Sequence, residues 1–442
     1  MTRPMRPVLF GLLLVCATLA YGAQAPKYIF LFIGDGMGFN HVEASQIYAE
    51  KVGTDTGERS LLFPTFPVMT QVCTRSASHL ITCSSAAATA LATGEKTTNY
   101  VIGMDAKKQH GLKSLARQLK GKGYKIGIIT SASIDHATPG GFYASQPDRS
   151  MYYEIGVDAA NSGFDFFGGA GLLQPRSKRN ASAPCLYDLF HQKGYTMYRG
   201  MDAYNRSHVK DKVLLFPTDT VSGSLKYALD RSEKDLGLPD LTKACLDNFA
   251  ETAKKGFFMM VEGGKIDWAA HAHDAATVVT ETIDFDQCIR LAYEFYKKHP
   301  DETLILVTAD HETGGLGLGN SGTNLNIELL KYQQCSQGAL TNAMRKMKSA
   351  VAIPSWEEMK FFLKKKSKDI VSLYAKDEPL AVAAVALLDK KASIGWTTKS
   401  HTGAPVPLYV VGKQAHLYSG RRDNTDMANI LRRLFNLKQW EE

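Results

Sequence analysis

Four apolar runs constrain the fold of this chain more than any other feature of its sequence. They occupy residues 28–33, 125–130, 256–261 and 303–308, and glycine or polar residues follow each run within a few positions. Runs that are apolar on both faces are typical of strands buried between helices in a parallel sheet. Weaker candidate strands lie at 68–72, 164–169, 213–216 and 406–411. We therefore predict an α/β fold with a mostly parallel central sheet and helices on both faces.

Side chains that can bind metal ions recur just past the ends of these runs. Those that follow a run are Asp35, Thr138, Glu262, Asp310 and His311. Asp267 and His271 come soon after Glu262 and are four residues apart, so they share one face of a helix. The carboxyl ends of parallel strands meet at one edge of a sheet, where ligands bind. Carboxylates with imidazoles suit zinc, and carboxylates with a hydroxyl suit magnesium, so the pattern predicts a metal centre.

A helix start rich in small residues is the candidate reactive segment. It runs from Cys83 to Gly94 and carries hydroxyl groups at Ser84 and Ser85, followed by alanines. The N-terminus of a helix favours an anion, and small side chains let a substrate approach the backbone. A serine here could attack phosphorus if its proton were removed. Because no base lies nearby in the sequence, we expect metal ions to activate it; close packing of a Ser/Ala-rich helix is the alternative.

The first 25 residues are typical of a secretory signal peptide. Arg3 and Arg6 precede an apolar segment at 8–20, and small residues follow it. The apolar segment is too short for a membrane span, although an uncleaved anchor is the alternative. We predict a mature catalytic domain over 26–442 that is secreted or periplasmic, with no integral membrane span after cleavage.

Composition narrows the remaining possibilities. The net charge of +8 favours anionic ligands, but the lysines are spread out, which argues against nucleic-acid binding. From about 324 to 391 helical periodicity and lysines dominate, so we predict a helical insertion there. Six cysteines remain after the leader is removed, and they permit disulfides without determining their pairing. No Cys-x-x-Cys occurs, which argues against a thiolate zinc ribbon.

Taken together, these motifs resemble those of the alkaline phosphatase family. The segments that carry the resemblance are 34–38, 84–97, 136–139, Glu262 with Asp267 and His271, 308–311, and 401–403. The resemblance extends from about residue 28 to 435. It is weak between about 155 and 240 and absent from the predicted insertion.

The resemblance implies a role for each site residue. Asp267, His271 and His401 would hold one zinc ion. Asp35, Asp310 and His311 would hold a second zinc that faces Ser84. A third ion, usually magnesium, would be bound by Asp35, Thr138 and Glu262. Arg149 would bind two phosphate oxygens with its planar guanidinium.

The resemblance also implies the reaction. A secreted phosphatase of this kind hydrolyses phosphate monoesters by two-metal, in-line displacement through a phosphoserine intermediate. Dimers are common in the family, so we predict a homodimer.

Three positions depart from the family pattern. Cys83 stands where an aspartate usually precedes the nucleophile and helps to orient the arginine. The ten-residue spacing to Gly94 favours Ser84 as the nucleophile, with Ser85 as the alternative. His136 and Trp268 stand where some members have other residues beside the third site. We therefore consider cobalt or zinc as alternatives to magnesium in that site.

Three other functions are compatible with parts of this sequence. A related sulfatase would need Pro and Arg shortly after Cys83, and neither is present. A phosphodiesterase of the same superfamily is the stronger rival, although Arg149 suits the dianion of a monoester better. A secreted metal- or phosphate-binding protein without activity would lack a nucleophile or ligand, and no such loss is visible in the sequence.

Overall fold

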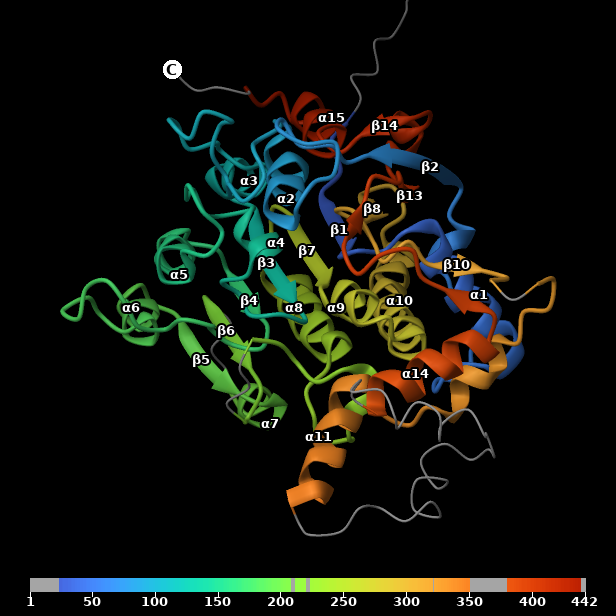
Figure 1. The fold of residues 1–442 in the computed structure, drawn as a ribbon. Coiled ribbons are helices and arrows are strands. Elements are labelled where there is room, and N and C mark those ends of the chain that lie inside the picture. The colour runs from blue at the N-terminus through green and yellow to red at the C-terminus, as the bar shows by residue number, and fades with distance from the viewer. Residues whose placement is uncertain (1–23, 208–210, 220–222, 321, 350–379, 439–442) are drawn as a thin grey trace, which may run out of the picture.

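A ten-stranded sheet forms the centre of the molecule (Figure 1). The computed structural model describes residues 24–207, 211–219, 223–320, 322–349 and 380–438. The order of strands across the sheet is β14-β2-β13-β8-β1-β7-β3-β4-β6-β5. Their bounds are β1 Tyr28–Gly34, β2 Val68–Cys73, β3 Lys125–Thr130, β4 Phe166–Gly168, β5 Thr196–Arg199, β6 Val213–Phe216, β7 Phe257–Gly263, β8 Thr303–Thr308, β13 Val406–Gly412 and β14 Arg422–Asp423.

The four strong apolar runs occupy the middle of this sheet and run parallel. β1 lies between β7 and β8, and Ile33 pairs with both Glu262 and Thr308, so the three strands end at nearly the same level. β13 runs antiparallel to β8 and β2. The segment that precedes β13 therefore lies at the same edge as the carboxyl ends of β1, β7 and β8.

Helices cover both faces of the sheet. Their bounds are α1 Phe39–Val52, α2 Ser84–Thr93, α3 Leu115–Gly121, α4 Ala137–Gly140, α5 Tyr152–Asn161, α6 Leu186–Gln192, α7 Met201–Asn205, α8 Leu238–Thr252, α9 Lys265–Ala272, α10 Ala275–Lys298, α11 Gln337–Ser349, α14 Leu380–Lys391 and α15 Asp426–Leu434. Neighbouring residues of a strand point to opposite faces. Phe257 contacts Phe249 of α8 and Phe295 of α10, whereas Phe258 contacts Phe142 just after α4. The predicted α/β class, mostly parallel sheet and two helical layers are confirmed.

Two parts of the sequence prediction fall wholly or partly outside the described residues. Residues 1–23, which hold most of the predicted signal peptide, are not described. Within the described residues no helix is both long enough and apolar enough to cross a membrane. The predicted insertion is described at its two ends, where α11 packs against α14, while residues 350–379 lie outside the description. The six cysteines after the leader, all among the described residues, are free thiols.

Candidate active site

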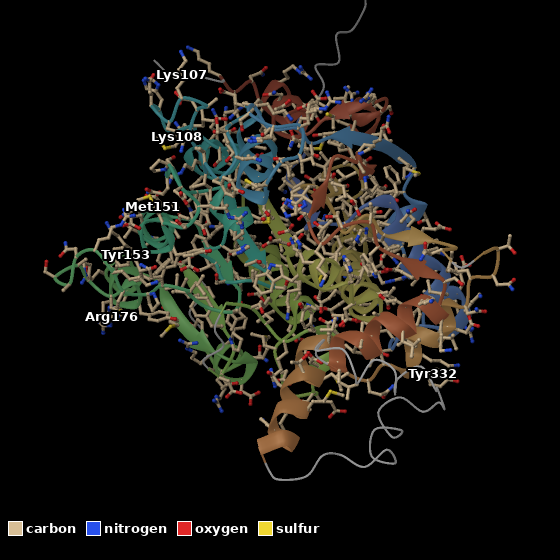
Figure 2. The ribbon with its side chains drawn as sticks, in the orientation of Figure 1. Lys107, Lys108, Met151, Tyr153, Arg176 and Tyr332 are labelled. Carbon is tan, nitrogen blue, oxygen red and sulfur yellow. The ribbon has the colours of Figure 1, made fainter. Side chains whose placement is uncertain are left out.

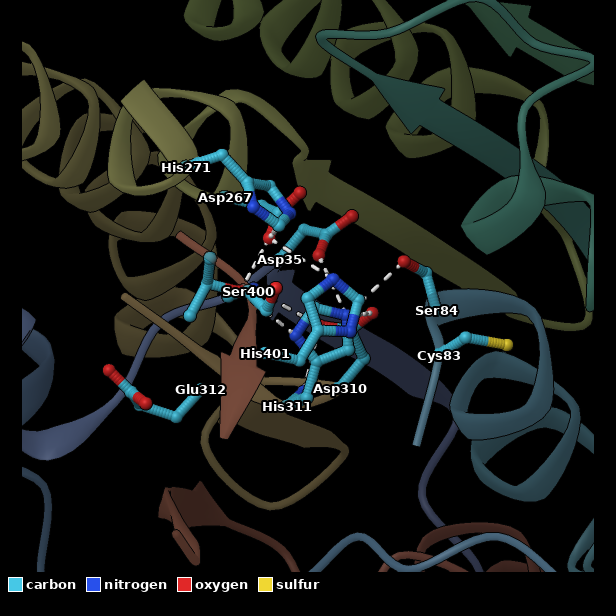
Figure 3. A network of polar contacts seen from close by, with 12 residues as sticks. Asp35, Cys83, Ser84, Asp267, His271, Asp310, His311, Glu312, Ser400 and His401 are labelled. Carbon is cyan, nitrogen blue, oxygen red and sulfur yellow. Dashed lines mark hydrogen bonds and ion pairs between the residues drawn. The ribbon is translucent and has the colours of Figure 1, made fainter. Parts of the chain in front are cut away.

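Ser84 is the first residue of α2, and its side chain points toward the edge of the sheet (Figure 3). Its Oγ lies 3.2 Å from His311 Nε2. Ser85 is equally buried, but its Oγ lies 3.2 Å from Cys83 Sγ. α2 can approach α4 closely because its residues are small: a Cβ on Gly141 would lie 2.8 Å from that of Ala88. Of the two serines, Ser84 faces the predicted metal ligands.

The first group of candidate ligands lies past the ends of β1 and β8. Asp35, Asp310 and His311 each present a ligand atom, and these atoms lie within 4.8 Å of one another. His311 Nε2 is 3.5 Å from Asp35 Oδ1 and 3.3 Å from Asp310 Oδ2. All three residues are fully buried. The family resemblance implied that these residues share an ion, and their side chains do lie close together.

A second group forms where α9 meets the segment before β13. Asp267, His311 and His401 also present atoms within 4.8 Å of one another. His271 Nε2 lies 3.3 Å from Asp267 Oδ1, and His401 Nε2 lies 3.7 Å from the same oxygen. The resemblance assigned Asp267, His271 and His401 to one ion, and Figure 3 shows His271 above Asp267 on the same helix. His311 belongs to both groups, whereas His271 is a member of neither and contacts Asp267.

The imidazole rings are oriented by acceptors behind them. His401 Nδ1 lies 3.0 Å from the Thr82 carbonyl and His271 Nδ1 lies 2.5 Å from the Lys399 carbonyl. A carbonyl oxygen cannot donate, so each neutral ring carries its proton on Nδ1 and leaves Nε2 free to bind a metal. This is the tautomer that a metal site requires.

Thr313 connects the two groups and was not predicted from the sequence. Its hydroxyl donates to Asp267 Oδ1 at 2.5 Å and lies 3.2 Å from His311 Nδ1. Its backbone N–H donates to Gly36, next to Asp35, and it pairs with His401 between the short strands β9 (Glu312–Thr313) and β12 (His401–Thr402). Its place two residues after His311 brings it near the site, but nothing in the local sequence indicates its contact with Asp267.

The third predicted site contains buried oxygens without partners. Asp35 Oδ1 and Oδ2, Thr138 Oγ1 and Glu262 Oε1 are buried without a hydrogen bond of good geometry, and the same is true of Asp310 Oδ2. Glu262 Oε2 accepts the hydroxyl of Thr130. His136 packs edge-on against Trp268 beside this site, and its buried Nδ1 has no partner. Unpaired buried oxygens are costly, so this donor set fits a bound cation.

The pKa shifts in this cluster also favour a bound cation. Burial raises the pKa of Asp35 well above its usual range, and the charges of Asp310 and Asp267 raise it further. Burial also raises the pKa of Glu262 and that of Asp310 to about 7. Burial lowers the pKa of His311 well below its usual range. Carboxylates that repel one another around neutral imidazoles are stabilised when cations bind between them.

Arg149 lies close enough to the cluster to influence the pKa of His136. The pKa of His136 is lowered to about 3. Burial is the main cause, and the positive charge of Arg149 is the second. Its backbone N–H donates to the Tyr100 carbonyl at 2.7 Å, which anchors the loop before α5. Cys83, at the position of the family's aspartate, receives a hydrogen bond from the Tyr100 N–H at 3.0 Å. The thiol therefore contacts Tyr100 and Ser85.

The fold and the site define an α/β protein with two groups of candidate metal ligands beside a serine. The family model described as alkaline phosphatase matches residues 26–165 and 186–437. The second range continues through residues 324–391, where we predicted an insertion without resemblance, and residues 166–185 lie between the two ranges.

Individual alkaline phosphatases are similar to this chain in sequence and in structure. Alkaline phosphatase 4 of Bacillus subtilis is 32% identical over 92% of this chain and 88% of its own length. The crystal structure of a cold-active alkaline phosphatase from Shewanella sp. is 29% identical, with a TM-score of 0.79 over 92% of this chain and 99% of that one. Thermus thermophilus alkaline phosphatase, at 24% identity, has the same fold with a TM-score of 0.80, and the match covers 94% of this chain and 93% of that one.

The chain belongs to the alkaline phosphatase family. It is therefore a metal-dependent phosphatase that acts on phosphate esters.

Proposed function

We propose that this enzyme hydrolyses phosphate monoesters with Ser84 as the nucleophile and two zinc ions in the paired ligand groups. The observation that carries the proposal is the 3.2 Å distance from Ser84 Oγ to His311 Nε2, because His311 belongs to both groups. A serine next to two cation sites has the neighbours that two-metal phosphoryl transfer requires. Zinc ions bound there would lower the pKa of the Ser84 hydroxyl and offset charge on the leaving oxygen.

The residues of the chain supply the rest of the chemistry. Ser84 Oγ forms a bond to phosphorus as the bond to the leaving oxygen breaks, and water then releases phosphate from the serine. The free N–H groups at the start of α2 favour the anionic phosphoryl group.

An acid quench during turnover, followed by mass spectrometry, should find one phosphoryl group on the peptide that contains Ser84. Phosphorylation of Ser85 instead would overturn the assignment.

The third site takes Asp35, Thr138 and Glu262 as ligands, with magnesium as its proposed occupant and cobalt or zinc as alternatives. Its support is the set of unpartnered oxygens on these three residues. His136 and Trp268 lie beside the site and form an edge-on ring contact. We further propose export from the cytoplasm and assembly as a homodimer, which rest on the sequence of residues 1–25 and on the family.

Arg149 distinguishes monoester from diester substrates in this proposal. A monoester dianion has three non-bridging oxygens, so two can bind the planar guanidinium while the third faces the metal groups. A diester has only two non-bridging oxygens, which leaves one for Arg149. Arg149→Ala is expected to lower kcat/KM for a monoester by about 100-fold and for a matched diester by about tenfold or less. Steady-state kinetics on phenyl phosphate and diphenyl phosphate measures both. Equal losses would remove this argument for monoesters.

Thr313 is expected to support metal binding. Thr313→Val keeps the shape of the side chain and removes the hydroxyl that contacts Asp267 and His311. Loss of such a contact behind metal ligands weakens metal affinity by about tenfold to 100-fold. Zinc titration of the metal-free protein measures the change. Thr308→Val is the control, because the Thr308 hydroxyl donates to the Pro407 carbonyl rather than to a ligand side chain. Unchanged zinc affinity in Thr313→Val would contradict the expectation.

A further inference from the structure

Three large apolar side chains remain exposed on the loops on either side of α2. Leu80 is 71% exposed, Ile81 47% and Tyr100 61%. The loop with Leu80 and Ile81 leads directly into Ser84, and Tyr100 follows the end of α2. Exposed apolar side chains that gather in one place mark a surface that contacts a ligand or a partner. We call these three residues the apolar rim.

Hydrogen bonds join both loops of the apolar rim to the residue before Ser84. The Asn99 side chain donates to the Ile81 carbonyl at 3.0 Å and accepts from the Cys83 N–H at 3.2 Å. The Tyr100 N–H donates to Cys83 Sγ. The rim is therefore held in place relative to Ser84 although its side chains are exposed.

Tyr100 has a strained backbone. Its φ is 71°, in the left-handed region that a bulky aromatic residue rarely adopts. Its carbonyl accepts the backbone N–H of Arg149, so the strained residue lies directly beside the proposed phosphate-binding arginine. Strain of this kind concentrates at sites that contact ligands.

Ile81 lies on the other side, beside the ligand His401. The carbonyl of the next residue, Thr82, accepts from His401 Nδ1, and a Cβ on Gly403 would lie 3.8 Å from Ile81 Cγ1. The apolar rim thus has Tyr100 next to Arg149 and Ile81 next to the His401 segment, with Ser84 on the chain between them.

We propose that Tyr100 and Ile81 determine specificity by contacting the alcohol part of the phosphate ester. This inference rests on the proposed monoesterase function, since it requires phosphorus at Ser84 and its free oxygens at Arg149. The alcohol then extends from the phosphorus toward solvent, where the apolar rim is exposed. An aromatic or extended apolar alcohol gains contact with the rim, whereas a small polar alcohol gains little.

The test compares two esters in several variants of the whole enzyme. Tyr100→Ala is expected to lower kcat/KM for 1-naphthyl phosphate by about fivefold to tenfold, mostly through KM, while kcat/KM for glycerol phosphate and inhibition by inorganic phosphate change less than about twofold. Ile81→Ala is expected to act in the same direction. Tyr332→Ala is the control, because Tyr332 is an exposed tyrosine that Figure 2 shows far from α2.

A glycine variant separates ligand contact from a backbone role. Tyr100→Gly removes the ring and relieves the left-handed strain, so it is expected to raise Tm. Its kcat/KM for 1-naphthyl phosphate is nevertheless expected to fall as much as that of Tyr100→Ala. Retained naphthyl phosphate activity in Tyr100→Gly would overturn the proposal, as would equal losses on both esters. A change in oligomeric mass in Tyr100→Ala would instead assign the rim to a second copy of the chain. A wild-type enzyme that hydrolyses neither ester would overturn the proposed function itself.

Discussion

Replacing Ser84 with alanine is expected to lower monoester turnover by about 10⁴-fold or more, since removal of a nucleophile eliminates the covalent route. The candidate ligands belong to other segments of the chain, so bound metal should stay at the wild-type level. Steady-state kinetics with elemental analysis of the same preparation measures both quantities.

Ser85→Ala is the matched control for this experiment. It removes one hydroxyl from the neighbouring residue of the same helix turn, and that hydroxyl contacts Cys83 rather than a candidate ligand. Ser85→Ala is therefore expected to retain activity within about tenfold. An active Ser84→Ala together with an inactive Ser85→Ala would show that the register of the nucleophile is one residue later.

Removing the metal ions is expected to abolish activity and to destabilise the protein, with zinc restoring both. Bound ions stabilise the folded state by about 4 kcal/mol per site when free metal exceeds the dissociation constant about 1,000-fold. Chelation leaves the buried carboxylates of Asp35, Asp310 and Glu262 to repel one another. Thermal unfolding and monoester hydrolysis, followed before and after chelation, measure the two losses. Hydrolysis that resists complete metal removal would overturn the metal mechanism.

The destabilisation caused by metal removal is expected to increase as pH rises. In the metal-free protein the pKa of Glu262 and that of Asp310 are about 7, above their ordinary values of 4.5 and 3.8. The folded state then binds more protons than the unfolded state between about pH 4 and pH 7, so the contribution of these groups falls as pH rises through that window. Metal binding needs the deprotonated ligands and strengthens over the same range.

The difference in Tm between metal-loaded and metal-free protein should therefore widen from about pH 5 to about pH 8. Buried acids elsewhere, such as Glu281, titrate in both forms, so their effect on Tm cancels in this difference. Glu262→Gln serves as the control, because it keeps the shape of the side chain and should reduce the pH dependence. A gap in Tm that stays constant or narrows with pH would contradict the expectation.

Much of the fold could be predicted from the sequence, because buried parallel strands need apolar residues on both faces. All four strong runs are central strands, and the weaker runs 68–72, 164–169, 213–216 and 406–411 also contain strands. β5 was not predicted, since Thr196–Arg199 is short and has mixed polarity. Its place at the edge of the sheet depends on pairing with β6.

The candidate site was predictable in its ligand types and less so in its arrangement. His401 does not follow a parallel strand; it came from the family resemblance. The structure explains its position, because β13 is antiparallel and its preceding segment meets the carboxyl ends of the other strands. Thr313 was missed because its hydroxyl bonds Asp267, 46 residues away in sequence, and no local pattern reports such a contact.

The sequence by itself determined which residues could bind metal and where the strands lie, since apolar runs and ligand types are local properties. Tertiary structure decided which candidate ligands lie together and which serine faces them. The register of β1 with β7 and β8 brings together the strand ends that precede Asp35, Asp310 and Asp267. The position of α2 at this edge places Ser84 beside His311, while Ser85 turns toward Cys83. These outcomes depend on contacts between segments far apart in the chain.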